Sequence, residues 1–360
     1  MKNTVKYFLG ANSCEGFVSH FKDSYSAEDG YRAYIIKGGP GTGKSSFMKS
    51  IAKKAQENGY EVHLCPCSSD PDSLDGVVIP ELKVTLLDGT APHIVEPDFP
   101  GACERLIDLG EYWDFNKLLK NRTKIMAAST KNSLLHKRAS GYLSACGELL
   151  ADNLRLEDNC IKKKQLYAFA KNICEKYIKQ KGTTGRQTVR FIGAVTPKGE
   201  MSYSETLTSG IKNAVIIEDR YGAVSGRIVE AVKENAVRAG YDVIVFKNPL
   251  LPSFICDHII IPELSLLVAS ENQSTKINLD IRRVHSRRFT DVLKLKAVRQ
   301  RMLLNRRIAK ELLDTACETL SLAKASHDEL EKYYIKAMDF SAVKKREEKT
   351  AEEIFGLPAE

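Results

Sequence analysis

The chain has 360 residues, about two domains of ordinary size, and 43% of them are hydrophobic and 28% charged. This composition excludes an intrinsically disordered chain, and the longest apolar run, 259–269, is too short to cross a bilayer. The net charge is +8, and most of it lies in one segment. Nine scattered cysteines and the lack of an apolar segment after the N-terminal lysines favour a cytoplasmic protein with reduced thiols.

Copy one, defined as residues 1–182, opens with the pattern of an α/β sheet. Short apolar runs predict strands at four places, which are residues 7–11, 33–36, 61–64 and 84–87. Residues 44–58 have apolar side chains at helical spacing and are followed by Gly59, a residue typical of a helix C-terminus. Strands that alternate with a helix indicate a mostly parallel sheet covered by helices.

A glycine-rich turn connects the strand at 33–36 to the helix that begins at Lys44. It fits the pattern G-x-x-x-x-G-K-[ST], the Walker A motif, without a mismatch. Glycines let the backbone point N–H groups at phosphate oxygens, and the helix N-terminus adds the positive end of its dipole. The predicted nucleotide-binding residues are Gly38, Gly39, Pro40, Gly41, Thr42, Gly43, Lys44, Ser45 and Ser46.

Three side chains are expected to carry the chemistry of ATP and Mg²⁺ at this turn. Lys44 is expected to reach the β- and γ-phosphates, as a catalytic residue, and the Ser45 hydroxyl to bind Mg²⁺. Asp88 follows the strand at 84–87 and is a candidate catalytic carboxylate that holds Mg²⁺ directly or through water. The alternative for Asp88 is an ordinary turn aspartate before Gly89.

Three more carboxylates, Asp70, Asp72 and Asp75, follow the strand at 61–64. Asp70 lies nearest to the strand end and is the first candidate to orient an attacking water or a substrate hydroxyl. Asp-Pro and Asp-Gly pairs are also common in turns, so a purely structural role stays open. Asp75 recurs as Asp257 further along the chain, which favours a structural role for that residue.

Residues 115–180 lack strand signals and carry apolar residues at helical spacing, and residues 290–355 repeat this pattern. Three pairs of segments also match at offsets of 181 to 183 residues: 8–16 with 191–199, 59–62 with 240–243, and 75–82 with 257–264. These collinear matches predict a duplication, with residues 183–360 as copy two. The expected fold is α/β: two tandem modules, each a mostly parallel sheet covered by helices and followed by a long helical hairpin.

At this point the sequence resembles the P-loop NTPases. Four segments, 37–45, 67–75, 78–82 and 87–93, look like a family of bacterial ATPase-like proteins built from a duplicated P-loop module, and the similarity spans the whole chain. The resemblance implies a P-loop NTPase-type fold for each copy and nucleotide binding. It implies no particular substrate.

Copy two has lost the glycine-rich turn. Aligned at an offset of 181, Ser225 stands opposite Lys44, and Asp219 adds a negative charge where phosphates would lie. These changes predict that copy two does not bind ATP there. It is then a structural pseudo-NTPase, or it completes the copy-one site with Arg220 or Lys198 as a charge-neutralising residue.

The positive charge is concentrated in residues 281–310, which contain eleven basic residues and one acid. Such a segment can bind nucleic acid, an anionic membrane surface or an acidic partner. Its single aromatic residue, Phe289, gives little support to base stacking. Packing against the acidic stretch 98–114 of copy one, or a solvated face, is therefore favoured over nucleic acid.

The leading hypothesis is a Mg²⁺-dependent ATPase with its active site in copy one, with nucleotide as ligand and no membrane partner. The helical hairpins are candidate surfaces for a protein partner. One alternative is a small-molecule or nucleotide kinase that uses the same loop. Another is an ATP-gated scaffold that binds nucleic acid or protein. For Lys44→Ala, loss of nucleotide binding with a retained fold is expected.

Overall fold

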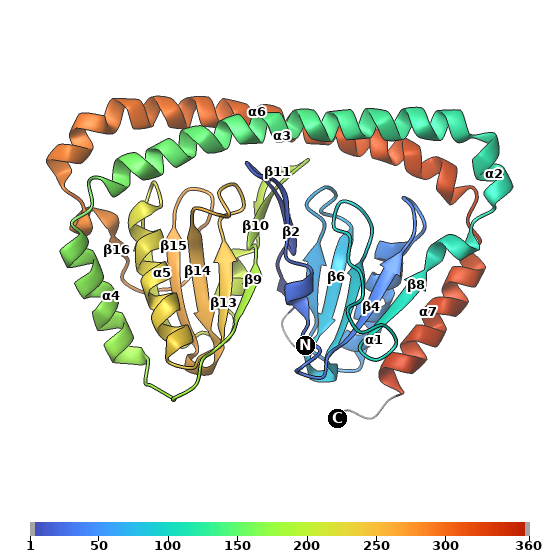
Figure 1. The fold of residues 1–360 in the computed structure, drawn as a ribbon, viewed down its shortest axis with the longest axis horizontal. Helices are drawn as coiled ribbons and strands as arrows, with labels where there is room; N and C mark the ends of the chain where they lie inside the picture. The colour runs from blue at the N-terminus through green and yellow to red at the C-terminus, as the bar shows by residue number, and fades with distance from the viewer. Residues whose placement is uncertain (1–3, 357–360) are drawn as a thin grey trace.

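The computed structural model describes residues 4–356, which form two six-stranded sheets beneath two long helices (Figure 1). The first sheet has the order β1–β5–β6–β7–β4–β8, with β1 (Val5–Lys6), β4 (Arg32–Lys37), β5 (His63–Pro66), β6 (Leu74–Ile79), β7 (Val84–Asp88) and β8 (Glu104–Asp108). The second has the matching order β9–β13–β14–β15–β12–β16, with β9 (Gln187–Arg190), β12 (Asn213–Glu218), β13 (Val243–Lys247), β14 (Cys256–Ile261), β15 (Leu266–Glu271) and β16 (Val284–His285). The prediction of an α/β fold with two similar sheets is confirmed.

Each sheet has five parallel strands and one antiparallel strand, which is β6 in the first sheet and β14 in the second. The antiparallel strand brings its first residues to the edge at which its parallel neighbours end. The two copies also contribute hairpins between the sheets, formed by β2 (Gly10–Ser13), β3 (Gly16–Ser19), β10 (Gly193–Thr196) and β11 (Gly199–Ser202). Short 3₁₀ helices complete the connections: η1 (Lys22–Ser24), η2 (Pro80–Leu82), η3 (Leu109–Tyr112), η4 (Ser204–Thr208), η5 (Pro262–Leu264) and η6 (Ser286–Phe289).

The sequence located β4 and β7 better than the other strands of copy one. The runs at 33–36 and 84–87 lie within β4 and β7, and the run at 61–64 overlaps β5. The run at 7–11 overlaps only the beginning of β2. Strands β6 and β8 were not predicted, because Asp75 and Gly76 interrupt the first and charged residues dominate the second.

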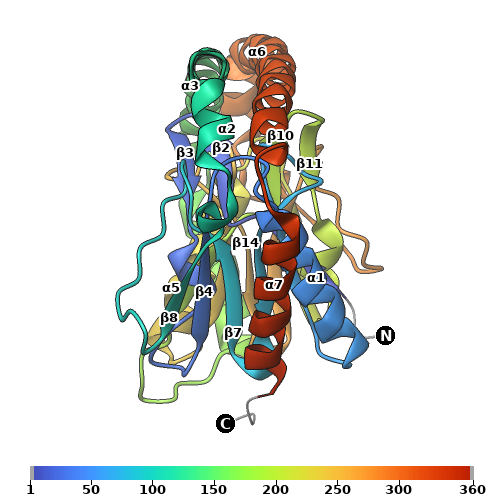
Figure 2. The same cartoon turned by 90° about the vertical axis from the view of Figure 1, so that its right-hand side faces the viewer.

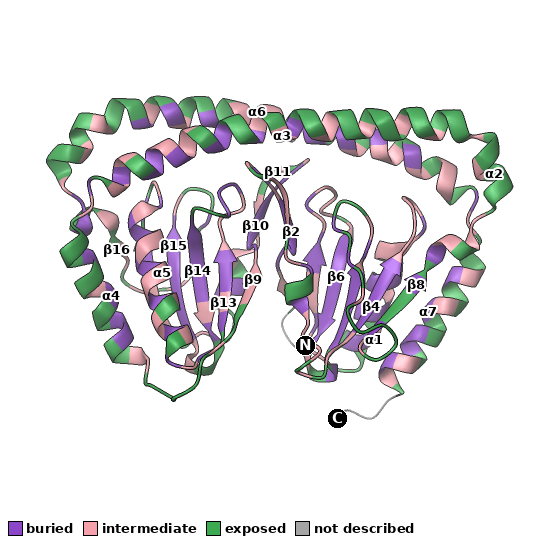
Figure 3. Ribbon diagram, in the orientation of Figure 1, coloured by how far each residue is buried: buried purple, intermediate pink, exposed green. Residues whose placement is uncertain are grey.

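Alternation along the strands separates two cores. Ile36 and Leu86 face helix α1 (Lys44–Glu57), which matches the predicted helix, whereas their neighbours Ile35 and Leu87 face the opposite side. On that opposite side, residues of both copies share one apolar core, in which Ile35 lies with Ile216 of copy two. Figure 3 shows the resulting buried strands in both sheets. The copies are therefore joined through the sheets as well as through the helices.

Within residues 4–356, six further α-helices follow α1: α2 (Phe115–Lys120), α3 (Arg122–Asp158), α4 (Lys163–Tyr177), α5 (Ala223–Arg238), α6 (Val292–Ile335) and α7 (Phe340–Phe355). The two longest, α3 and α6, run from one copy to the other. Helix α3 begins beside the first sheet and ends beside the second, where α4 packs against α5. Helix α6 runs in the opposite direction, and α7 packs against α1. Figure 2 shows α3 and α6 side by side above the sheets.

The expectation that each module carries its own helical hairpin is wrong, because α3 of copy one pairs with α6 of copy two. Helix α3 has 37 residues and, at about 1.5 Å per residue, spans about 55 Å, which is longer than one module. Its antiparallel partner is α6 of the other copy: Asn153 Nδ2 donates to the Met302 carbonyl oxygen at 3.1 Å, and Arg301 forms an ion pair with Asp152 at 2.8 Å. The buried apolar residues of both helices share one core, to which copy two adds Val195, Leu250, Leu251 and Ile255.

Within residues 4–356, no helix combines the length and apolar character needed to cross a membrane.

Candidate functional site

The glycine-rich loop, residues 38–43, joins the end of β4 to the first turn of α1. Gly41 and Gly43 have φ values of 68° and 92°, in the left-handed region that favours glycine. Thr42 is buried, and its hydroxyl donates to the Gly39 carbonyl oxygen at 2.9 Å. The loop therefore turns tightly and places the N-terminus of α1 beside the end of β4.

Lys44 folds back over this loop. Its Nζ donates to the carbonyl oxygens of Gly38 and Gly39 at 2.9 and 3.0 Å and lies 3.6 Å from Asp88 Oδ2. Asp88 ends β7, which pairs in parallel with β4, and its Oδ1 accepts from the Thr90 backbone N–H at 2.9 Å. The ammonium and the carboxylate that sequence reasoning singled out are thus side by side at the same sheet edge.

The two serines after Lys44 differ. Ser45 Oγ accepts a 2.9 Å hydrogen bond from the Leu74 N–H at the start of β6, so its hydroxyl lies beside the sheet. Ser46 is exposed on α1. Pro40 is half-buried within the loop.

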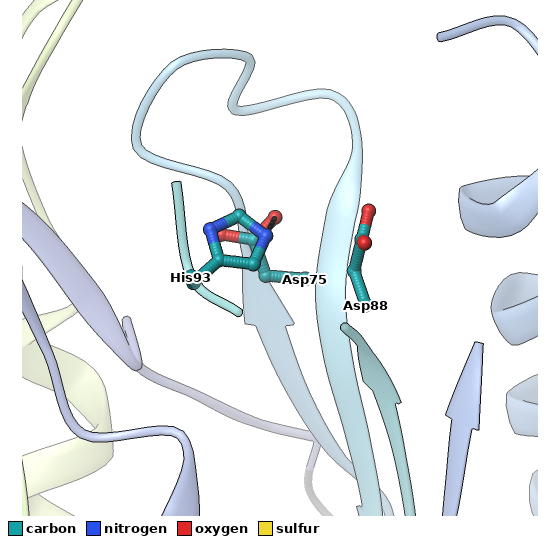
Figure 4. Close-up of side chains that lie close together, drawn as sticks. All are labelled: Asp75, Asp88 and His93. Atoms are coloured by element: carbon teal, nitrogen blue, oxygen red, sulfur yellow. Dashed lines mark ion pairs between the residues drawn. The ribbon is translucent and has the colours of Figure 1, made fainter. Parts of the chain in front are cut away.

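Two side chains beside Asp88 had no site role in the sequence prediction. Asp75 is the second residue of β6 and Asp88 the last of β7, each one step beyond the Gly76–Leu87 pair, and their carboxylates lie close together. His93, in the segment after β7, has its Nε2 at 3.8 Å from Asp75 Oδ1 (Figure 4). Burial raises the pKa of Asp75 to about 6, with His93 opposing the rise and Asp88 adding to it.

The recurrence of Asp75 as Asp257 favoured a structural role for Asp75. His93 was not a candidate site residue, because it lies in an irregular segment. Only the antiparallel register of β6 against β7 brings Asp75 to Asp88. The sequence did carry one signal for this group, because Asp88 and His93 lie in one short stretch directly after the apolar run at 84–87.

Asp70 and Asp72 have other described partners. Asp70 accepts from the Ser73 hydroxyl at 2.8 Å, and Lys324 of α6 lies 3.5 Å from it. Asp72 forms an exposed ion pair with Lys198 at 2.7 Å. The contacts described for both carboxylates thus lead to copy two, rather than to Lys44 or Asp88.

The end of α6 covers the glycine-rich loop. The Gly41 N–H donates to Glu331 Oε1 at 3.1 Å. A Cβ placed on Gly39 would lie 2.9 Å from the Tyr334 ring, and one on Gly41 would lie 3.0 Å from the Glu331 carbonyl oxygen. Since α6 belongs to copy two, a segment of one copy closes over the loop of the other.

The corresponding loop of copy two is two residues shorter than the offset of 181 assumes. Gly222 precedes α5 with φ 97°, as Gly43 precedes α1, so Ala223 and not Ser225 stands at the place of Lys44. Ser270, in β15, takes the place of Asp88 by register. The charged pair of copy one is therefore replaced by uncharged residues.

Carboxylates also occupy the N-terminus of α5. The Ala223 N–H donates to Glu157 Oε2 at 2.9 Å, and the Ser225 N–H donates to Asp219 Oδ2 at 2.8 Å. Burial, reinforced by the charge of Asp219, raises the pKa of Glu157 well above its usual range. The position where a helix N-terminus would receive an anion is filled by the protein's own acids.

The proposed cations of copy two separate in space. Lys198 reaches copy one at Asp72, whereas Arg220 remains in copy two, over the Tyr221 ring and near Arg306. The basic segment 281–310 does not pack on the acidic stretch 98–114, because they lie at opposite ends of the molecule (Figure 1). The basic residues find other partners, among them Glu271 for Arg283 and Asp152 for Arg301.

No protein-family model, curated protein or solved structure matches this chain.

Proposed function

We propose that copy one binds Mg²⁺·ATP at residues 38–46 and hydrolyses it, as a P-loop NTPase, while copy two serves as a pseudo-NTPase. The observation that carries this proposal is the 3.6 Å approach of Lys44 Nζ to Asp88 Oδ2 beside a glycine-rich loop and a helix N-terminus. The loss of both charged groups in copy two supports a division of labour, because a phosphate-binding lysine and a Mg²⁺-binding carboxylate are needed together.

The residues present fit a magnesium ion. Ser45 offers a hydroxyl and Asp88 a carboxylate, the oxygen donors that Mg²⁺ prefers. Lys44 now donates to two loop carbonyl oxygens, and phosphate oxygens would give its ammonium stronger, charge-assisted partners. In this proposal Lys44 neutralises the phosphates, and Asp70 positions the attacking water from the same edge of the sheet.

The test is calorimetry with ATP and Mg²⁺. Wild type is expected to bind one nucleotide per chain, and Lys44→Ala to lose binding with an unchanged circular dichroism spectrum. Lys53→Ala is the control, because Lys53 lies on the same helix, is exposed and pairs with Glu57. Binding by Lys44→Ala with wild-type affinity would overturn the site assignment. Asp70→Asn is expected to retain binding and to lose turnover.

A second candidate is a nucleotide-gated scaffold, which the Gly41–Glu331 contact favours because it joins the loop to a helix that spans both copies. ATP binding without turnover, together with an ATP-dependent change in hydrogen exchange along α6, would support the scaffold over the ATPase. Turnover in water without any added acceptor would support the ATPase.

A further inference from the structure

Three side chains with metal-ligating atoms meet at the edge of the first sheet. They are Asp75 from β6, Asp88 from β7 and His93 from the following segment, and their ligand atoms lie within 4.8 Å of one another. Figure 4 shows the His93 ring beside the Asp75 carboxylate, with Asp88 on the neighbouring strand. The cluster combines two carboxylates with one imidazole.

The fold holds these groups in place. Asp75 and Asp88 lie on the neighbouring antiparallel strands β6 and β7, each next to a member of the Gly76–Leu87 pair. The His93 ring stacks on Phe21 at a centroid distance of 4.3 Å, and the His93 N–H donates to the Thr90 carbonyl oxygen at 3.1 Å. The imidazole is therefore fixed by packing and by its backbone rather than by a partner for its nitrogens.

Three buried polar atoms of His93 and Asp75 lack hydrogen-bond partners within the described part of the chain. His93 is 6% exposed and Asp75 is 3% exposed, yet both His93 ring nitrogens and Asp75 Oδ2 have no hydrogen-bond partner among residues 4–356. The 3.8 Å between His93 Nε2 and Asp75 Oδ1 is too long for a hydrogen bond. Buried polar atoms are rarely left unpaired, so these point to a ligand between them.

We propose that Asp75, Asp88 and His93 bind one divalent first-row transition metal ion, such as Mn²⁺ or Co²⁺. Two carboxylates balance the charge of the ion, and the imidazole selects such a metal over Mg²⁺, which prefers oxygen ligands. Three protein ligands leave coordination positions open on the ion.

Copy two contains a natural counterpart without the site. Asp257 corresponds to Asp75, but Ser270 replaces Asp88, and Thr275 stands at the His93 position at the same offset of 182 residues. Asp257 Oδ2 accepts from Asn248 Nδ2 at 2.9 Å, so a protein donor fills the place of an ion. The metal ion is therefore specific to copy one.

This inference goes beyond the proposed function and does not depend on it, although Asp88 is shared. The experiment omits nucleotide, so a failure of ATP binding leaves its outcome unaffected. Lys44→Ala removes a cation beside Asp88 and is expected to retain the metal ion while losing ATP.

The test is titration of chelator-treated protein with Co²⁺, followed by its visible absorption, and with Mn²⁺, followed by electron paramagnetic resonance. One ion per chain is expected, with retention in millimolar Mg²⁺. His93→Gln and Asp75→Asn are expected to weaken binding roughly 100-fold or more, because each removes one of three ligands. Asp257→Asn, the matched change in copy two, is expected to bind as wild type does.

Thermal unfolding keeps the variants interpretable. The metal is expected to raise the melting temperature of wild type and Asp257→Asn, but not that of His93→Gln. The proposal is overturned if wild type takes up no ion, or if His93→Gln binds as tightly as wild type. It is also overturned if His327→Gln, in the cluster of His327, Asp328 and Glu331 on α6, abolishes binding instead.

Discussion

The backbone N–H of Gly41 donates a 3.1 Å hydrogen bond to the carboxylate of Glu331, which lies 290 residues further along the chain. The loop for which we propose phosphate binding thus holds a carboxylate from copy two. A bound triphosphate would compete with that carboxylate for the same donor and would be repelled by its charge.

Glu331→Gln is therefore expected to tighten nucleotide binding about three- to tenfold, because the neutral amide removes a like charge from the phosphate position. Calorimetry with ATP and Mg²⁺ measures this change. Glu329→Gln is the control, since Glu329 is exposed on the same helix and pairs with Lys332. Weaker binding by Glu331→Gln would instead assign Glu331 a supporting role in the nucleotide complex.

The crossover of the helices predicts which parts of the chain depend on α4 and α7. Ile354 of α7 is fully buried in the core that contains α1, and Leu166 of α4 is fully buried in the core that contains α5. Ile354→Ala is expected to lower the free energy of unfolding by about 2–5 kcal/mol and to speed amide exchange in α1. Leu166→Ala is expected to speed exchange in α5. The reverse assignment would contradict the crossover.

Two glycines of α3 form a matched pair. A Cβ on Gly147 would lie 2.1 Å from the Cys14 Cβ, whereas one on exposed Gly141 would meet no atom within 4 Å. Gly147→Ala is expected to cost about 1–3 kcal/mol of unfolding free energy through overpacking. Gly141→Ala is expected to stabilise by up to about 1 kcal/mol, because alanine is the better helix former. Chemical denaturation measures both, and equal effects would show that α3 does not pack closely on the β2–β3 turn.

Asp257 predicts a pH dependence of stability. Burial raises the pKa of Asp257 to about 7, although the hydrogen bond from Asn248 opposes the rise. Between about pH 4 and 7 the folded chain holds a proton that the unfolded chain has lost, so this carboxyl lowers the unfolding free energy as pH rises. Above pH 7 both states are ionised and the penalty is constant.

Asp257→Asn is thus expected to gain stability relative to wild type by a few kcal/mol between pH 4.5 and 7.5, at about 1.4 kcal/mol per pKa unit. Denaturation in the presence of a chelator measures the difference without a contribution from metal. A difference between the two proteins that stays constant over this range would show that Asp257 titrates normally.

Local features of this chain could be predicted from its residues. The glycine-rich loop, the helix at α1 and the carboxylate at the end of β7 all depend on short stretches, in which spacing reports backbone geometry directly. The duplication was also visible, because both copies keep matching segments at a nearly constant offset. Strand β8 was not predicted, because it is an edge strand and its charged residues resemble those of a loop.

The sequence by itself determined two α/β copies, one glycine-rich loop with Lys44, and its degeneration in copy two. The tertiary structure alone decided that α6 covers this loop, that α7 packs on α1, and that Asp75 and His93 meet Asp88. The reason is physical: an apolar helix face specifies burial but not its partner, and a carboxylate at a strand end specifies an edge but not its neighbours. Those choices depend on helix length and strand register, which only the complete fold sets.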